Sequence, residues 1–412
     1  MQLSSTDRAM LEGDHGDGVA FAMELVVKLA EVSNAPALID ITSAHIDGCL
    51  YHGEAGTDFV ERLVIGGASV SVPTTLNVSS LDLLHPELYR GSPNTAAAAR
   101  RLMDFHVALG CEATWTCAPY QLAVRPSLGQ QIAWGESNAI VFANSVLGAR
   151  TNRYGDFADL ACAITGRAPF AGLHTDAGRA ATVVVNLDLD SRWHERELLY
   201  PLLGHWIGMQ CGNGIPAIVG LDGGTTEDDL KALGAAAASS GATAMFHAVG
   251  ITPEAGTLEQ ATRSRDVPQL VVSDAALIAI RASIGSGEGR LGAVSVGTPH
   301  MSAAELTRLA GLAGGNRTSV PFYINTSRSV WASVPPDTID ALTAFGATVV
   351  TDTCTYITPI MGGVEGTVMT NSAKWAYYAP GNLGVKVALG SLRECVASAI
   401  AGKVDLDDHS LA

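Results

Sequence analysis

The second half of the chain alternates short apolar runs with amphipathic ones, and this alternation constrains the fold more than any other feature. Thr226 precedes Glu227, Asp228 and Asp229, an arrangement typical of a capped helix with acidic residues at its positive end. Helical spacing extends over 226–239, 303–313 and 337–345, and short apolar runs typical of strands occupy 217–220, 244–247, 293–296, 322–325 and 348–351. Repeated units of this length predict an α/β fold of parallel sheets with helices on both faces.

The first half is less regular. Ala37–Ile41 predicts a short buried strand that ends in a polar turn, Thr42–His45, where parallel-sheet proteins usually place ligand groups. Residues 136–153 mix apolar side chains with neutral hydrogen-bonding ones, which indicates a polar pocket in an otherwise dry region. Glycines cluster around residue 210, so we expect two regions, 1–210 and 211–412.

Charge and hydropathy exclude several classes of partner. With 25 basic and 41 acidic side chains in 412 residues, the net charge is −16. Such a surface repels nucleic-acid phosphates and anionic lipid faces, so we expect neither a nucleic acid nor a membrane as partner. The longest apolar runs are far shorter than the roughly 20 residues that span a bilayer. The first eleven residues show no apolar stretch typical of a signal peptide, and we expect a cytoplasmic protein.

The seven cysteines offer two interpretations. In a cytosolic protein most free cysteines are small buried hydrophobes, and no C-x-x-C pair is present. Three of them nevertheless lie where thiolates are favoured: Cys117 in a proline-containing loop, Cys354 just past a strand, and Cys395 after Ser391 at the start of a predicted helix. A cluster with three protein thiolates would leave one iron open for a substrate. Spacing alone leaves both interpretations open.

Nine strings, in order along nearly the whole chain, match one known family. They are Met10–Gly13, Ser43–Gly48, Cys117–Tyr120, Trp134–Ala139, Ala143–Arg153, Gly297–His300, Thr351–Cys354, Thr370–Lys374 and Glu394–Val396. Each string alone is unspecific, but together they make the chain resemble the aconitase X family, a branch of the aconitase superfamily, and in particular its large subunit.

This resemblance implies an aconitase-like α/β fold without the small swivelling domain that closes the active site. It also implies an iron–sulfur cluster held by Cys117, Cys354 and Cys395, either [2Fe-2S] or [4Fe-4S]. The family members are dehydratases (hydro-lyases) that act on a small hydroxy acid, and their small domain supplies a catalytic serine. We therefore expect a partner, a small subunit that carries this domain.

Several polar residues within or near these strings are candidates for the chemistry. We expect His45 and Lys374 to be catalytic. A structural role is an equal alternative for His45, and Lys374, one of five lysines, lies between Cys354 and Cys395 in the sequence. Arg150 and Arg153 suit a substrate carboxylate, because a guanidinium binds a carboxylate through two parallel hydrogen bonds. The candidates for binding a ring amine or other substrate groups are Glu12, Ser43, Glu136, Ser137, Asn138, Asn144 and Ser145.

The substrate is less constrained than the reaction. The resemblance allows cis-3-hydroxy-L-proline, which would give Δ1-pyrroline-2-carboxylate, or mevalonate 5-phosphate. Only five of the 25 basic residues are lysine, unlike the lysine-rich proteins of hyperthermophiles, and this favours the bacterial hydroxyproline reaction. An alternative of another class is a cluster-free α/β binding or scaffold subunit with merely buried cysteines.

Overall fold

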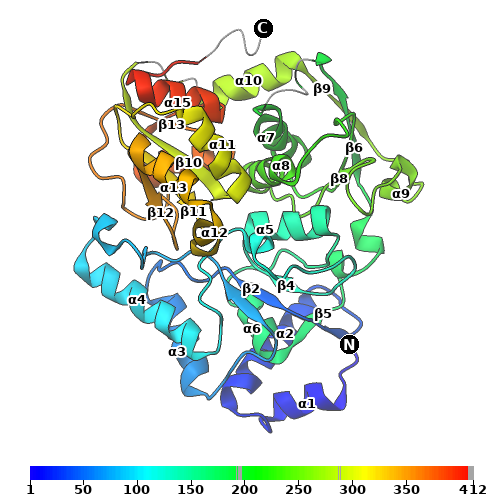
Figure 1. Cartoon of the computed structure of the whole chain (residues 1–412). Coiled ribbons are helices and arrows are strands. Elements are labelled where there is room, and N and C mark those ends of the chain that lie inside the picture. Colours follow the sequence, from blue (N-terminus) through cyan, green and yellow to red (C-terminus); the bar gives the residue numbers. More distant parts are fainter. Residues whose placement is uncertain (192, 194–196, 286, 288, 407–412) are drawn as a thin grey trace.

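The computed structural model describes all residues of the chain except 192, 194–196, 286, 288 and 407–412. Four sheets lie in three segments of the chain, which meet near the centre of the molecule (Figure 1). None of the helices in the described part is long and apolar enough to cross a lipid bilayer. The expected α/β class, with several parallel sheets flanked by helices, is confirmed.

The first segment contains a parallel three-stranded sheet in the order β3-β2-β4 and a small antiparallel pair, β1-β5. Helices α2 and α6 pack together beside these strands and fill one apolar core. The strands are β1 (Leu38–Asp40), β2 (Ala44–Ile46), β3 (Thr74–Leu76), β4 (Ala133–Trp134) and β5 (Arg167–Pro169). The helices are α1 (Ser5–Glu12), α2 (Asp17–Val32), α3 (Glu54–Ile65), α4 (Pro93–Ala108), α5 (Ser137–Phe142) and α6 (Ala158–Thr165), with a π-helical turn at Ala143–Leu147.

The sequence prediction for 37–45 is wrong in one respect. The expected strand forms β1 but pairs antiparallel, and the expected polar turn contains β2, so His45 lies within a strand rather than in a loop. Thr42 and Ser43 carry the chain from one sheet to the next and make backbone hydrogen bonds with Gln131 and Ala133 around the start of β4. The backbone N–H of Ile41 still donates to Gly166, whereas that of Ala44 already donates to Pro73 beside β3.

The second segment is a parallel sheet in the order β8-β7-β6-β9, against which α7 and α8 pack closely. A side chain at Gly204 in α7 would place its Cβ 2.1 Å from the carbonyl oxygen of Leu233 in α8, so only glycine allows this approach. The division of the chain after residue 210 stays a prediction. The elements are β6 (Val183–Asp188), α7 (Leu199–Cys211), β7 (Pro216–Val219), α8 (Glu227–Ser240), β8 (His247–Ala248), α9 (Leu258–Thr262), β9 (Gln269–Ser273) and α10 (Asp274–Gly285).

The third segment is a five-stranded parallel sheet in the order β12-β11-β10-β13-β14. Successive residues of β13 alternate between faces: Val368 joins the core that contains Trp375 of α14, and Met369 the core that contains Leu309 of α11. Helices therefore cover both faces, as predicted. The elements are β10 (Leu291–Met301), α11 (Ala303–Ala313), β11 (Phe322–Thr326), α12 (Arg328–Ser333), α13 (Pro336–Phe345), β12 (Ala347–Val350), β13 (Thr367–Thr370), α14 (Ala373–Leu383), β14 (Lys386–Leu389) and α15 (Leu392–Ala401).

Candidate functional site

The candidate site lies where the carboxyl ends of strands from the first and third segments meet. Asp47, Asn77 and Glu136 follow β2, β3 and β4, which run parallel in one sheet. His300 lies near the end of β10, and Cys354 follows β12 in the other sheet. Such carboxyl edges are where open α/β sheets bind ligands.

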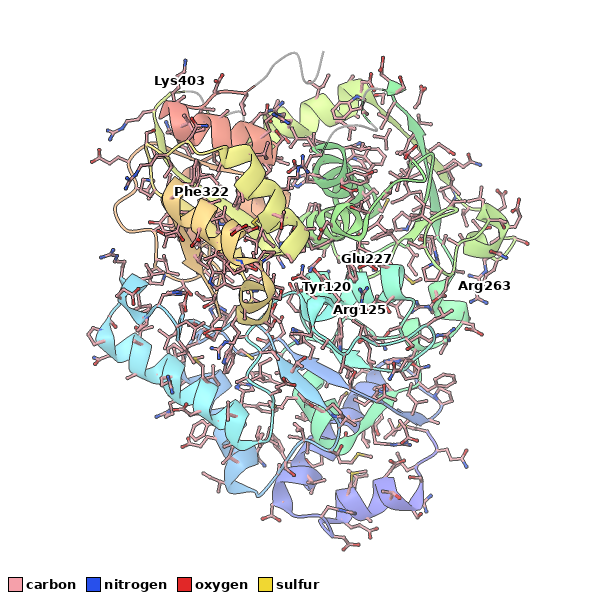
Figure 2. The ribbon with its side chains drawn as sticks, viewed as in Figure 1. Tyr120, Arg125, Glu227, Arg263, Phe322 and Lys403 are labelled. Carbon is pink, nitrogen blue, oxygen red and sulfur yellow. The ribbon has the colours of Figure 1, made fainter. Side chains whose placement is uncertain are left out.

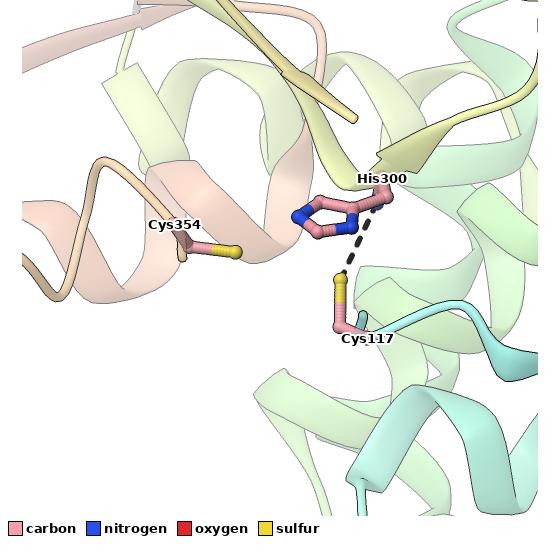
Figure 3. A group of neighbouring side chains, drawn as sticks. All are labelled: Cys117, His300 and Cys354. Carbon is pink, nitrogen blue, oxygen red and sulfur yellow. Dashed lines mark hydrogen bonds between the residues drawn. The ribbon is translucent and has the colours of Figure 1, made fainter. Parts of the chain in front are cut away.

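Two cysteines and one histidine form a possible metal site at this junction (Figure 3). One donor atom from each of Cys117, His300 and Cys354 lies within 4.8 Å of the others, and all three residues are buried. The backbone N–H of His300 donates to the Cys117 sulfur at 3.3 Å. Thiolate and imidazole are ligands suited to iron, zinc and iron–sulfur centres, so the donor set fits a cluster.

The imidazole of His300 is fixed on both sides. Its Nδ1 lies 3.1 Å from the Thr116 hydroxyl, and its Nε2 lies 3.3 Å from the carbonyl oxygen of Thr353. Burial lowers the pKa of His300 to about 4, so the ring is neutral at neutral pH. The sequence analysis did not assign His300 a role, although its string Gly297–His300 follows a predicted strand.

Glu136 and Lys374 form a buried ion pair beside this group. Lys374 Nζ lies 2.5 Å from Glu136 Oε1, and the side chains are only 5% and 4% exposed. Glu136 caps α5, where its Oε2 accepts from the backbone N–H of Ala139 at 2.6 Å. Burial opposes both charges, but the partners of each group outweigh it. Lys374 and the Ala139 N–H hold the pKa of Glu136 below the ordinary value of a glutamate. The charge of Glu136 holds the pKa of Lys374 well above the ordinary value of a lysine. The pair is therefore ionised.

Two predicted substrate-binding residues lie beside this pair and the Cys117 loop. The Ser137 hydroxyl donates to Glu136 at 3.2 Å and accepts from Lys374 at 3.3 Å. The Asn138 amide donates to the Tyr120 hydroxyl at 2.6 Å and to the Cys117 carbonyl at 3.4 Å. Within the described part of the chain, the buried Asn138 Oδ1 has no hydrogen-bond partner.

His45 and Asp47 project from the same face of β2 and its extension, two residues apart. His45 is fully buried, with Nδ1 2.8 Å from the Thr75 hydroxyl, and burial lowers its pKa to about 4. Asp47 was missed, although it belongs to the matched string Ser43–Gly48. Burial, then the charges of Glu136 and Asp156, raise its pKa to about 7. Only the assembled fold brings these charges together.

Two predicted substrate ligands stay outside the junction. Glu12 is exposed at the end of α1, which lies at the bottom of Figure 1, far from the three-segment junction. Ser43 immediately precedes β2 and so lies at the amino edge of this sheet, opposite Asp47.

The residues predicted in the π-helical turn and the loop after it have partners within the protein, and their role toward a substrate stays a prediction. Asn144 bonds both backbone groups of Thr151, and the Ser145 hydroxyl accepts the backbone N–H of Phe246. Arg150 pairs with Asp176 at 2.5 Å, and Arg153, which is exposed, donates to the Ala238 carbonyl at 3.4 Å.

The structure does not bring Cys395 to the other two predicted cysteine ligands. Its side chain packs with Leu309, Phe322 and Val396 in the apolar core between α15 and the third sheet. Burial, followed by the charges of Glu197 and Glu394, raises the pKa of this thiol well above its ordinary value. The predicted helix does begin after Ser391, which caps it, but the helix turns Cys395 inward.

A cavity of about 440 Å³ lies next to the Cys117 loop, lined by residues from all three segments. Tyr120, Arg125 and Glu227 mark it near the centre of Figure 2. Arg125 pairs with Glu227 across it at 2.9 Å. Tyr120 connects the cavity to the site, because its hydroxyl is the partner of Asn138.

Three family models match almost the whole chain: aconitase X first domain at residues 1–177, second domain at 181–282 and third domain at 291–401. The chain is 43% identical to cis-3-hydroxy-L-proline dehydratase of Pseudomonas aeruginosa and 40% identical to that of Hypocrea jecorina, over 98% of its own length and 70% of theirs. It is 35% identical to the phosphomevalonate dehydratase large subunit of Methanosarcina mazei, over 98% of both chains.

A solved structure agrees with these sequence relatives. The holo-form of aconitase X from Thermococcus kodakaraensis superposes with a TM-score of 0.88 at 33% identity, and the match covers 97% of this chain and all of that one. The family models, the fold and the dehydratase names of the relatives agree for this chain. The chain therefore belongs to the aconitase X family of hydro-lyases.

Proposed function

We propose that this chain is the large component of a dehydratase that converts cis-3-hydroxy-L-proline to Δ1-pyrroline-2-carboxylate. The observation that carries the proposal is the higher identity to relatives of that name, 43% and 40%, against 32–35% for the phosphomevalonate dehydratase large subunits. Mevalonate 5-phosphate is the second candidate, because the chain matches those subunits over 95–100% of their length.

Cys117, Cys354 and His300 would hold an iron–sulfur cluster, [2Fe-2S] or [4Fe-4S]. Their buried donor atoms, which come together from the first and third segments of the chain, support this assignment. When bound, the cluster supplies a Lewis acid for the oxygen of a poor leaving group, hydroxide. The position of Cys395 in another core favours His300 as the third protein donor.

Lys374 would bind the substrate carboxylate. An ammonium group has three N–H donors, of which two go to Glu136 and Ser137, and one is left for a substrate. Glu136 keeps this ammonium charged and in place, and Ser137 and Asn138 orient polar groups of the substrate. Such a contact is strong because the pair is shielded from water.

The proton next to the substrate carboxylate would be removed by a serine of a small subunit that carries the swivelling domain. The relatives named large subunits support such a partner. The chain spans 70% of the cis-3-hydroxy-L-proline dehydratases that it matches. We infer that the activity also requires a region equivalent to the part of these relatives that lies outside the match.

The test is turnover by the protein isolated from its own cells through a tag on this chain, so that any partner is retained. The proposal expects pyrroline-2-carboxylate from cis-3-hydroxy-L-proline and no dehydration of mevalonate 5-phosphate. Turnover of mevalonate 5-phosphate alone would contradict the proposed substrate. A complex that binds no iron and turns over neither compound would favour the cluster-free binding subunit.

A further inference from the structure

Dehydration requires a proton for the departing hydroxyl as well as a base for the carbon-bound proton. Hydroxide is a poor leaving group, and a positioned acid typically accelerates such a step by about 10²–10⁴-fold. The base is proposed to come from a small subunit, so the acid must be sought in this chain. This inference rests on the proposed dehydratase function.

The carboxyl group of Asp47 is held in place at the site by one oxygen, and its other oxygen is free to contact a ligand. Its Oδ1 accepts from the Asn77 amide at 2.5 Å, and its backbone N–H donates to Asp159 at 2.7 Å. Among the described residues, no hydrogen bond is made by its second carboxyl oxygen, and Asp47 is partly exposed, whereas Asn77 and Asp159 beside it are buried. A free oxygen on a fixed carboxyl is what a proton donor to a ligand needs.

Gly135 allows Asp47 to lie directly against the end of β4. A Cβ at Gly135 would be 2.9 Å from Asp47 Cβ and 2.1 Å from Asp159 Oδ2, so any larger residue would push both carboxyl groups away. Glu136 follows Gly135, so this packing also sets Asp47 beside the Glu136–Lys374 pair. The carboxyl group is therefore positioned from two strands.

The charged groups around Asp47 come from every element packed against it. Glu136 and Asp156 disfavour its negative charge, Lys374 favours it, and the buried Asp159 and Cys49 interact with it from α6 and from the turn after β2. With burial as the largest cause, the pKa of Asp47 rises to about 7, so much of the acid form survives at neutral pH. This is the range in which an acid is most effective.

The other titratable groups at the site suit this task less well. Lys374 is committed to Glu136 at 2.5 Å, which stabilises the protonated amine. Glu136 accepts hydrogen bonds from Lys374, Ser137 and Ala139, all of which favour the ionised carboxylate. His45 lies within β2 with no exposed surface and faces Thr75. Asp47 is the group that combines a proton, a fixed position and a free oxygen.

We propose that the Asp47 carboxyl is the general acid that donates the proton leaving with the substrate hydroxyl. The carbon–oxygen bond at C3 breaks, and its electron pair forms the O–H bond of water with the Asp47 proton. The serine base takes the proton from the adjacent carbon, and the electrons of that C–H bond form the carbon–carbon double bond. The resulting enamine tautomerises to Δ1-pyrroline-2-carboxylate, and Asp47 remains as a carboxylate until it is reprotonated.

The test compares Asp47→Asn with wild type in the complete complex, with kcat and KM measured on cis-3-hydroxy-L-proline from pH 5.5 to 9. Asparagine keeps the volume and can still accept from Asn77. We expect kcat to fall about 10²–10⁴-fold with KM little changed. In wild type, kcat declines above about pH 7 as the acid loses its proton, and this limb disappears in the variant.

Asp156→Asn is the matched control. Asp156 is exposed, and its charge raises the pKa of Asp47, so its removal moves the alkaline limb to lower pH and leaves the kcat plateau intact. Infrared difference spectroscopy supplies a readout independent of turnover: a protonated carboxyl band that titrates near pH 7 in wild type and is absent in Asp47→Asn. Wild-type iron content and a melting temperature no lower than that of wild type would show that the variant is folded.

The possible outcomes distinguish a failure of the acid assignment from a failure of the proposed function. If wild type dehydrates neither candidate substrate, the proposed function fails, whereas the titrating carboxyl band would still support the environment of Asp47. If wild type is active and Asp47→Asn retains its kcat and alkaline limb, the acid assignment is overturned. A rise in KM with unchanged kcat would also overturn it and would make Asp47 a ligand of the ring ammonium.

Discussion

Removal of the Lys374 ammonium should destabilise the protein strongly. Lys374→Met keeps the length of the side chain but leaves the Glu136 carboxylate, which is 4% exposed, without its cation. Breaking a buried ion pair from one side costs about 3–5 kcal/mol, because an uncompensated charge stays in the interior. Glu136 retains hydrogen bonds from Ala139 and Ser137, so we expect about 3 kcal/mol, a large part of an ordinary domain stability of about 5–15 kcal/mol.

The assay is urea denaturation followed by circular dichroism, on apo-protein at pH 7, with a double-mutant cycle. The double variant Glu136→Gln/Lys374→Met buries no lone charge and should be more stable than Lys374→Met alone. Arg100→Met is the control, because it breaks an ion pair whose side chains are 56% and 63% exposed and should cost less than about 1 kcal/mol. A Lys374→Met loss below 1 kcal/mol, or a double variant equal to the sum of both singles, would refute the reasoning.

Three further predictions concern buried charges. Burial raises the pKa of Asp47 to about 7, so from about pH 4 to pH 7 this carboxyl ionises in the unfolded chain but stays protonated in the folded protein, which costs about 1.4 kcal/mol of stability per pH unit. Asp47→Asn should therefore gain about 4 kcal/mol over wild type in urea melts between pH 4 and pH 8, and a constant difference would contradict this. Lys231, buried beside Glu305, joins the second and third segments; Lys231→Met should lower Tm in thermal scans by about 5–10 °C, and an unchanged Tm would contradict its role. Arg179, fully buried against Glu254, holds the π-helical turn through Asn144; Arg179→Met should speed amide hydrogen exchange over residues 143–151, and unchanged exchange would exclude this.

Local chemistry made much of the fold predictable. Thr226 caps its helix with acidic residues in the first turn, as the sequence indicated, and a helix begins after Ser391 as predicted. The helix predicted at 303–313 has those bounds, and the strand predicted at 322–325 is one residue longer. These elements are specified by periodicity and by caps, which depend on neighbours along the chain.

The sequence could not reveal which polar groups converge. Cys395 and Cys354 both follow polar residues at the ends of elements, yet α15 turns one into an apolar core and the loop after β12 turns the other toward Cys117. His300 lies beside Cys117 and Cys354 near the end of β10, although the string Gly297–His300 shows no metal-binding motif. The pKa of Asp47 is raised by burial in the assembled fold and then by the charges of Glu136 and Asp156, which lie about 90 to 110 residues away in the sequence. Each of these effects depends on contacts between segments distant in the chain.

The most direct test of the account is the iron and acid-labile sulfide content of anaerobically purified protein, measured for wild type and for single cysteine-to-serine variants. The account predicts that Cys117→Ser and Cys354→Ser lose both, whereas Cys395→Ser, whose thiol lies in the core of the third segment, keeps wild-type amounts. Loss of iron and sulfide from a folded Cys395→Ser protein, with retention in Cys354→Ser, would contradict the site at Cys117, His300 and Cys354.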